Sequence, residues 1–238
     1  MVEAPLEPVA EARFLYPTPG GAWYAVQGLR REPARALLQS LLIGESTPAL
    51  EAEWVATHAE VAADDVAELL RRMQSLGLLQ GLAESRHFPE GAIDQLLAAS
   101  LQQLSEQGRA ALADSQGLYV ASAGFAHESA EELAALSAEL AALGERHSGL
   151  LNANLGLAGS GWGLIGASGL SDIGFWPMYL GGQRFALIVQ GQPQFNQPAL
   201  IQLLWALGRR YGKAAELSAD TRRATVPADE SRVHTGNS

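Results

Sequence analysis

The chain has 238 residues, with 26 acidic and 16 basic side chains and a formal net charge of −10. This balance argues against nonspecific binding to nucleic-acid backbones, which depends on Lys and Arg displacing counterions from phosphates. The absence of cysteine excludes disulfides, thiolate zinc sites and cysteine nucleophiles. Glu3, Glu7 and Glu11 stand where a signal peptide would be basic and then apolar, so we expect a cytoplasmic, bacterial-type protein.

Residues 13–28 are predicted to form a short hairpin. Phe14-Leu15-Tyr16 and Trp23-Tyr24-Ala25-Val26 are aromatic or branched runs of the kind that favour strands. Between them, Pro17-Thr18-Pro19-Gly20-Gly21 has the composition of a turn. The N-terminal part is therefore expected to open with two antiparallel strands.

Three helices and a returning strand are expected next. Each helix has a proline or an acidic residue at its start, followed by apolar residues at helical spacing. The predicted segments are helices beginning at Glu32-Pro33 and Thr47-Pro48, a helix from Asp64 to Leu76, and strands at Leu78-Leu79 and near Phe88. This order of elements resembles a winged-helix module, which we place at residues 12–90.

A polar stretch from Glu84 to Gly91 separates this module from elements in a different order. The second half reads as a helix, two strands, a helix, three strands and a helix. In sequence terms, these are a helix from Ile93, strands 109–113 and 117–123, a helix opened by Ser129 and Glu132, a glycine-rich segment from His147 to Ser171, strands 175–180 and 185–189, and a helix after Pro198. Residues 213–238 are expected to be a disordered tail.

The run Leu112-Ala113-Asp114-Ser115-Gln116-Gly117-Leu118-Tyr119-Val120-Ala121-Ser122-Ala123-Gly124 resembles the opening hairpin of Roadblock (dynein light-chain) domains. In that family an aspartate turn and a glycine lead into a strand that ends in Ala-Ser or a close equivalent. The acidic, alanine-rich stretch 128–143 and the strand 185–190 also fall where the family has a helix and a strand. The resemblance covers residues 93–212, and we place the Roadblock-like dimerisation domain at residues 92–212.

The resemblance implies a profilin-like α/β/α domain with an antiparallel sheet. Roadblock domains homodimerise, commonly by extending the sheet and pairing helices. They act without catalysis, as scaffolds or regulators of Ras-like small GTPases, motor complexes or motility and signalling systems. The expected fold class is therefore α+β: a winged-helix-like module followed by a Roadblock-like dimerisation domain.

Two groups of residues are candidates for the dimer or partner interface. The first is a heptad-like seam on the predicted helix 128–143, extended by one further position; the second is an aromatic group on the strand 175–180. The candidates are Leu133, Leu136, Leu140, Leu143 and His147 in the seam, and Trp176, Met178 and Tyr179 on the strand. Each group has an alternative role inside the domain: the seam could pack on its own sheet, and the strand could be an ordinary half-buried one.

A winged helix also raises the hypothesis of a DNA-binding transcriptional regulator. The helix 64–76 offers Arg71 and Arg72 as surface candidates, but its first turns present Asp64, Asp65 and Glu68, which repel phosphates. Residues 1–91 hold seven arginines against thirteen acids, a net charge of −6. Protein contact is therefore the preferred function of this module, and DNA binding is the alternative.

No catalytic, cofactor or metal site is predicted. Gly161-Trp162-Gly163-Leu164-Ile165-Gly166 matches G-x-G-x-x-G, but the glycines and proline that follow it do not predict the helix that a dinucleotide site requires. None of the five histidines has H-x-x-x-H spacing, and no G-x-S-x-G is present. The uncharged stretch 148–171 contains too many glycines for a membrane span, and a buried sheet segment or a dimer surface explains it better. We therefore expect a non-enzymatic homodimeric scaffold or regulator without cofactors.

Overall fold

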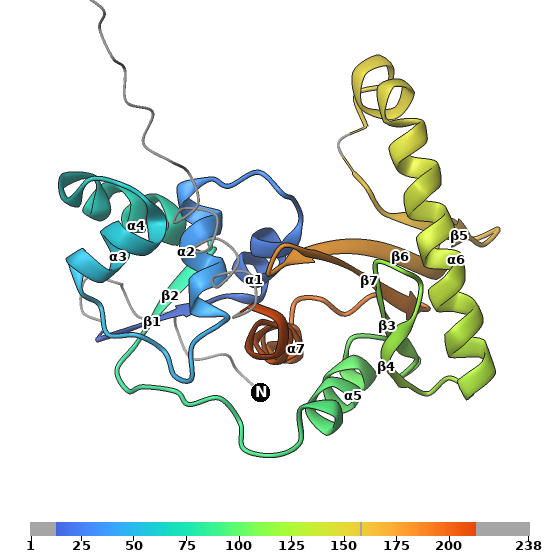
Figure 1. Cartoon of the computed structure of the whole chain (residues 1–238), viewed down its shortest axis with the longest axis horizontal. Helices are drawn as coiled ribbons and strands as arrows, with labels where there is room; N and C mark the ends of the chain where they lie inside the picture. Colours follow the sequence, from blue (N-terminus) through green and yellow to red (C-terminus); the bar gives the residue numbers. More distant parts are fainter. Residues whose placement is uncertain (1–12, 158, 213–238) are drawn as a thin grey trace, which may run out of the picture.

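A computed structural model describes residues 13–157 and 159–212, so the predicted tail at 213–238 lies outside the described residues. The fold is mixed α/β, with a two-stranded and a five-stranded antiparallel sheet (Figure 1). The N-terminal part contains β1 (Phe14–Pro17), α1 (Pro19–Val26), α2 (Pro33–Leu41), α3 (Ala52–Ala59), α4 (Val66–Ser75) and β2 (Leu79–Leu82). The remainder contains α5 (Ile93–Gln103), β3 (Ala110–Asp114), β4 (Tyr119–Ala123), α6 (His127–Arg146), β5 (Trp162–Ile165), β6 (Ser171–Leu180), β7 (Gln183–Gln190) and α7 (Pro198–Leu207).

The predicted element order of the second half is confirmed, and the strands form a sheet in the order β4-β3-β7-β6-β5. The turn between β3 and β4 depends on Asp114, whose Oδ1 accepts from the N–H groups of Gln116 and Leu118 at 2.9 and 3.0 Å. Gly117 has φ +83°, a conformation that favours glycine. The short helix at 149–154 was not predicted within the glycine-rich segment.

The predicted N-terminal hairpin is wrong in its second strand, because residues 23–26 belong to helix α1. Thr18 caps this helix by accepting a hydrogen bond from the N–H of Gly21 at 2.9 Å, and Pro19 occupies its first turn. A Cβ on Gly21 would lie 1.8 Å from the carbonyl oxygen of Leu78, so the glycine permits close approach of two backbones. β1 pairs instead with β2.

Three further local predictions are wrong. Helix α3 begins at Ala52, whereas Thr47 is buried: its backbone N–H donates to the carbonyl oxygen of Arg86 at 2.8 Å, and its Oγ1 accepts from the Arg86 N–H at 2.9 Å. Phe88 lies in a connection that pairs with Glu45, and its ring meets Trp205 edge-on at 5.7 Å. Helix α6 begins two residues before Ser129, after Ala126 as its N-cap, so Ser129 and Glu132 do not form the expected capping box.

Helices cover both faces of the five-stranded sheet. α6 packs on the face formed by Ala111, Ala113, Phe175 and Ile188, while α5 and α7 lie on the other face (Figure 1). Side chains alternate between these two faces along each strand, as the pleat requires. The resulting three layers match the α/β/α arrangement expected for this part of the chain.

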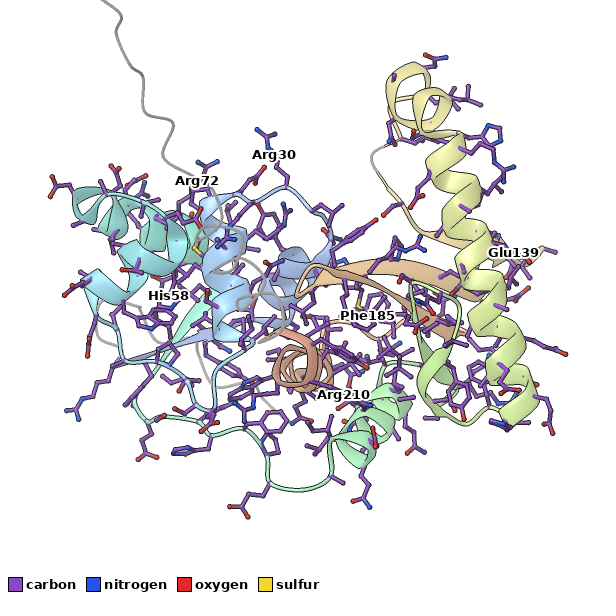
Figure 2. All side chains as sticks on the ribbon, viewed as in Figure 1. Arg30, His58, Arg72, Glu139, Phe185 and Arg210 are labelled. Atoms are coloured by element: carbon purple, nitrogen blue, oxygen red, sulfur yellow. The ribbon has the colours of Figure 1, made fainter. Side chains whose placement is uncertain are left out.

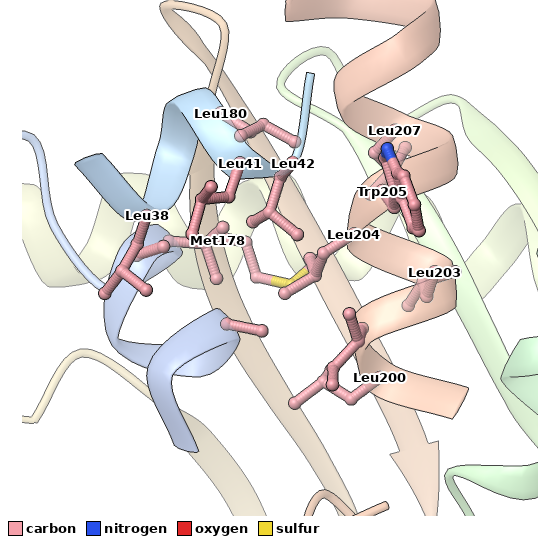
Figure 3. Packing of buried hydrophobic residues seen from close by; sticks show 14 of the residues in the cluster. Leu38, Leu41, Leu42, Met178, Leu180, Leu200, Leu203, Leu204, Trp205 and Leu207 are labelled. Atoms are coloured by element: carbon pink, nitrogen blue, oxygen red, sulfur yellow. The ribbon is translucent and has the colours of Figure 1, made fainter. Parts of the chain in front are cut away.

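Helix α7 connects the two parts of the molecule through one buried core. Figure 3 shows leucines of α2 facing residues of β6 and α7; this cluster includes Leu38, Leu41, Leu42, Met178, Leu180, Leu200, Leu203, Leu204 and Leu207. The indole N–H of Trp205 donates to the carbonyl oxygen of Gly44 at 2.7 Å. A Cβ on Gly208 would lie 2.1 Å from the carbonyl oxygen of Leu42. There is therefore no room for a side chain between the end of this helix and the backbone of the N-terminal part.

Candidate interaction surface

Strand β5 is an edge of the five-stranded sheet. Within the described residues it pairs with β6 alone, in a register that places Trp162 opposite Phe175 and Leu164 opposite Ile173. Its own side chains include two exposed apolar residues: Leu164 is 65% exposed and Ile165 is 64% exposed. A strand edge with unpaired backbone groups and exposed apolar side chains is a template for pairing with another strand.

The segment 148–171, called here the β5 segment, concentrates exposed apolar surface. Six of the ten exposed large hydrophobic side chains in the described part of the chain belong to it: Leu150, Leu155, Leu157, Leu164, Ile165 and Leu170. The segment contains no charged residue. The uncharged run predicted a buried sheet segment or a dimer surface here, but it did not identify these individual leucines. Exposed apolar residues concentrated in this way are typical of an interaction surface.

The predicted leucine seam of α6 divides between the domain interior and its surface. Leu133 and Leu140 pack against the sheet beside Phe175 and Ile188. Leu136 is 40% exposed. The two remaining seam positions are the half-buried Leu143 and the exposed His147. The seam therefore supports its own sheet with two leucines and leaves the rest of its surface accessible.

The aromatic candidates on β6 do not lie together. Met178 has no exposed surface, because α2 and α7 cover it (Figure 3), so in this fold its side chain is a core residue and cannot anchor a partner. Trp176 is half-buried on the same side of the sheet, whereas Tyr179 is half-buried and points to the side that carries α6. Trp176 and Tyr179 therefore belong to two separate surfaces.

The arginine candidates of the N-terminal part lie in a network of exposed charges. Arg71 contacts Glu68 with two nitrogens, one of them at 2.9 Å, and this bonding lowers the pKa of the Glu68 carboxyl. Arg72 lies close enough to Tyr24 and Glu32 to influence both, and Figure 2 shows Arg72 and Arg30 on the same side of this part. The positive charges here are balanced locally by carboxylates.

Glu32 is the centre of this network. The Tyr24 hydroxyl donates to Glu32 Oε2 at 2.8 Å, and this bond, reinforced by Arg35, Arg30 and Arg72, lowers the pKa of Glu32. Desolvation, followed by the same hydrogen bond, raises the pKa of Tyr24. The arrangement is an ion-pair network that stabilises the loop before α2.

No group of three or more potential ligands that could hold a metal ion occurs within residues 13–157 and 159–212. His58 stacks on Trp54 at 3.9 Å between ring centroids, and His127 Nδ1 lies 2.9 Å from the Tyr119 hydroxyl. The glycine motif 161–166 spans β5 and leads into β6 instead of a helix, so it is a strand connection, as preferred from the sequence. In the same described ranges, no helix combines the length and apolar character needed to cross a membrane.

No family model and no curated protein matches the chain. Among solved structures, the chain is similar to the Roadblock/LC7 domain from Streptomyces avermitilis, with 18% identity and a TM-score of 0.32, over 57% of this chain and 100% of that chain. It is also similar to Myxococcus xanthus MglB, with 19% identity and a TM-score of 0.27, over 58% of this chain and 92% of that chain.

Proposed function

We propose that the protein is a non-enzymatic scaffold that forms a homodimer through the β5 edge and the neighbouring surface of α6. The observation that carries this proposal is the open edge strand, with Leu164 and Ile165 exposed within an uncharged segment. A second copy of the same edge can pair with it antiparallel about a two-fold axis, since an isologous interface uses the same surface twice. The pairing would make one continuous sheet across both copies.

The burial of apolar surface would stabilise this dimer. Each large aliphatic side chain that passes from water into an interface contributes about 1.5–3 kcal/mol when its burial is complete. On α6, Leu136 is exposed next to Ala135, and Ala142 is exposed two turns further along. Such small residues let two helices approach closely, so α6 can contribute beside the strand edge.

The partner of the dimer is proposed to be a protein, specifically a Ras-like small GTPase or a component of a motility or signalling complex. This proposal is supported by the resemblance of residues 112–124 to the Roadblock hairpin. The winged-helix-like module at residues 12–90 would then orient or select a second protein. The hydrogen bond from the Trp205 indole N–H to the Gly44 carbonyl oxygen would help to hold this module in a fixed orientation relative to the dimer surface.

Light scattering after size-exclusion chromatography tests the dimer. The wild-type chain should have the mass of two copies, and Leu164→Asp combined with Ile165→Asp should have the mass of one. Leu118→Asp is the matched control, because Leu118 is 62% exposed on the β3–β4 turn at the opposite edge of the sheet. A wild-type monomer at the highest soluble concentration would refute the proposed assembly, as would equal dissociation by the control.

The partner class is tested separately with purified Ras-like GTPases loaded with GDP or a non-hydrolysable GTP analogue. We expect the dimer to bind one nucleotide state in preference to the other, and the Asp double variant to lose this binding. If the dimer binds none of these GTPases in either nucleotide state, the proposal of a GTPase partner is refuted, whereas the proposal of a homodimer is not affected.

A further inference from the structure

A groove opens on the face of the sheet opposite α6. It has a volume of about 610 Å³ and lies between helix α1, strands β5 and β6, and the connection that precedes α7. Its walls include Trp23 and Gln27 from the α1 region, Trp176 from β6 and Phe195 from the connection, while glycines around β5 contribute backbone. The groove is thus built jointly by the N-terminal part and the five-stranded sheet.

Three aromatic rings form one wall of this groove. The Trp23 ring lies 4.9 Å from Phe195 between centroids, and the Trp176 ring meets Phe195 edge-on at 5.1 Å and 82°. Since both indoles contact the same phenyl ring, they are no farther apart than about 10 Å. Contact between the rings fixes their orientations, so the wall exists before any partner arrives.

Glycines form the surface on which Trp176 lies. A Cβ on Gly174 would come within 2.2 Å of the Trp176 ring, and one on Gly161 would come within 3.1 Å. The indole therefore lies across backbone that has no side chain. This packing gives part of the glycine motif 161–166 a structural purpose that is independent of any nucleotide.

The groove offers hydrogen-bond donors but no charge. None of the described residues that line it is charged. The indole N–H groups of Trp23 and Trp176 form no hydrogen bond with any residue that the structure describes, and both side chains are half-buried. The Gln27 carboxamide has no hydrogen-bond partner in the same part of the chain. Indole donors without a partner on an aromatic wall can bind carbonyl oxygens.

We propose that this groove binds a proline-rich segment of a partner protein in the polyproline II conformation. Such a segment forms no internal hydrogen bonds, so its carbonyl oxygens are free to accept from indole N–H groups, and its rings pack on aromatic walls. One turn of this helix advances about 9 Å, which is within the upper limit of about 10 Å on the distance between the two indoles. The uncharged lining selects against charged segments, which would lose hydration without gaining an ion pair.

Ile165 lines this groove and also lies on the proposed dimer edge, so the groove is tested with variants of Trp23 and Trp176, which the dimer proposal does not use. The test uses the full chain and a synthetic decaproline peptide, with affinity measured by calorimetry. We expect saturable binding that weakens about tenfold in Trp23→Phe and in Trp176→Phe, since each keeps a ring and loses one donor. Trp54→Phe is the control, because Trp54 lies on α3, stacks on His58 and does not line the groove; its affinity should equal that of the wild type.

Three results would overturn the proposal. The first is the absence of saturable decaproline binding to the correctly folded wild-type chain, and the second is equally tight binding to the Trp23→Phe/Trp176→Phe double variant. A change of molar mass in Trp176→Ala would assign the groove to a second copy of the chain. Each of these outcomes is distinguishable from failure of the dimer proposal, which is read from the molar masses of the wild-type chain, of the Leu164 and Ile165 double variant and of the Leu118 control.

Discussion

Trp205→Phe probes the joint between α7 and the N-terminal part. Trp205 is 3% exposed and donates its indole N–H to the carbonyl oxygen of Gly44, across 161 residues of sequence. Its ring also meets Tyr16 and Phe88 edge-on at 6.2 and 5.7 Å. Phenylalanine keeps a ring at this position but cannot donate, so the Gly44 carbonyl would lose its partner.

The expected loss follows from these contacts. An unpaired, partly buried carbonyl costs about 1–3 kcal/mol, and the smaller ring leaves a void that costs about 1 kcal/mol more. We therefore expect Trp205→Phe to lower the free energy of unfolding by about 2–4 kcal/mol. For a chain of this size, that corresponds to a decrease in Tm of about 4–16 °C.

The assay is thermal and urea unfolding followed by circular dichroism and by tryptophan fluorescence. Because α2, β6 and α7 share one buried cluster, both signals should move together in a single transition. Trp54→Phe serves as the control and should change Tm little, since Trp54 is only half-buried. Two separate transitions, with only one of them shifted by Trp205→Phe, would refute the reasoning that the two parts unfold as a unit.

Three further outcomes are expected. Gly21→Ala should destabilise the fold strongly in thermal unfolding, because the new Cβ would collide with the backbone of Leu78; an unchanged Tm would contradict this packing. Glu32→Gln should be less stable than wild type above the ordinary carboxyl pKa, and the difference should vanish as the pH falls through the lowered pKa of Glu32; a difference independent of pH would count against the network. Tyr16 should ionise above the usual tyrosine pKa, because burial outweighs the attraction of Arg86, and spectrophotometric titration against Tyr16→Phe measures this.

The elements of the second half could be predicted because several local signals agreed. The turn at Asp114–Gly117 contains both the side-chain acceptor and the glycine that its backbone requires, and Gly181-Gly182 separates two strands that pair as a hairpin. The closing helix combines a proline at its start with apolar residues at helical spacing. Agreement between composition and periodicity therefore made these elements predictable.

The prediction of an N-terminal hairpin failed because the four residues Trp23-Tyr24-Ala25-Val26 fit a short strand or a short helix equally well. Residues 23–26 became helical because Thr18 caps the chain and Pro19 starts a turn, while the β1 edge was taken by β2, which lies far along the sequence. A local pattern carries no information about such a distant partner. Tertiary pairing decided the outcome.

The candidate surface was only partly predictable for a related reason. The leucine spacing on α6 indicated an apolar seam, but it could not separate Leu133, which packs on the sheet, from Leu136, which is exposed. The exposure of Leu164 depends on β5 being an edge strand, and the local spacing of residues does not predict the order of strands in a sheet. The burial of Met178 could not be predicted either, because it depends on the packing of both α2 and α7 against β6.

The position of α7 has a consequence for how the polypeptide emerges during synthesis. The leucines of α2 are made early, whereas the helix that covers them follows after an interval comparable to the 161 residues between Gly44 and Trp205. At typical rates of elongation, this interval lasts about 8–32 s. The α2 leucines that face α7 therefore lack this cover for that time, and transiently exposed apolar surface of this kind makes an unfinished chain prone to aggregation.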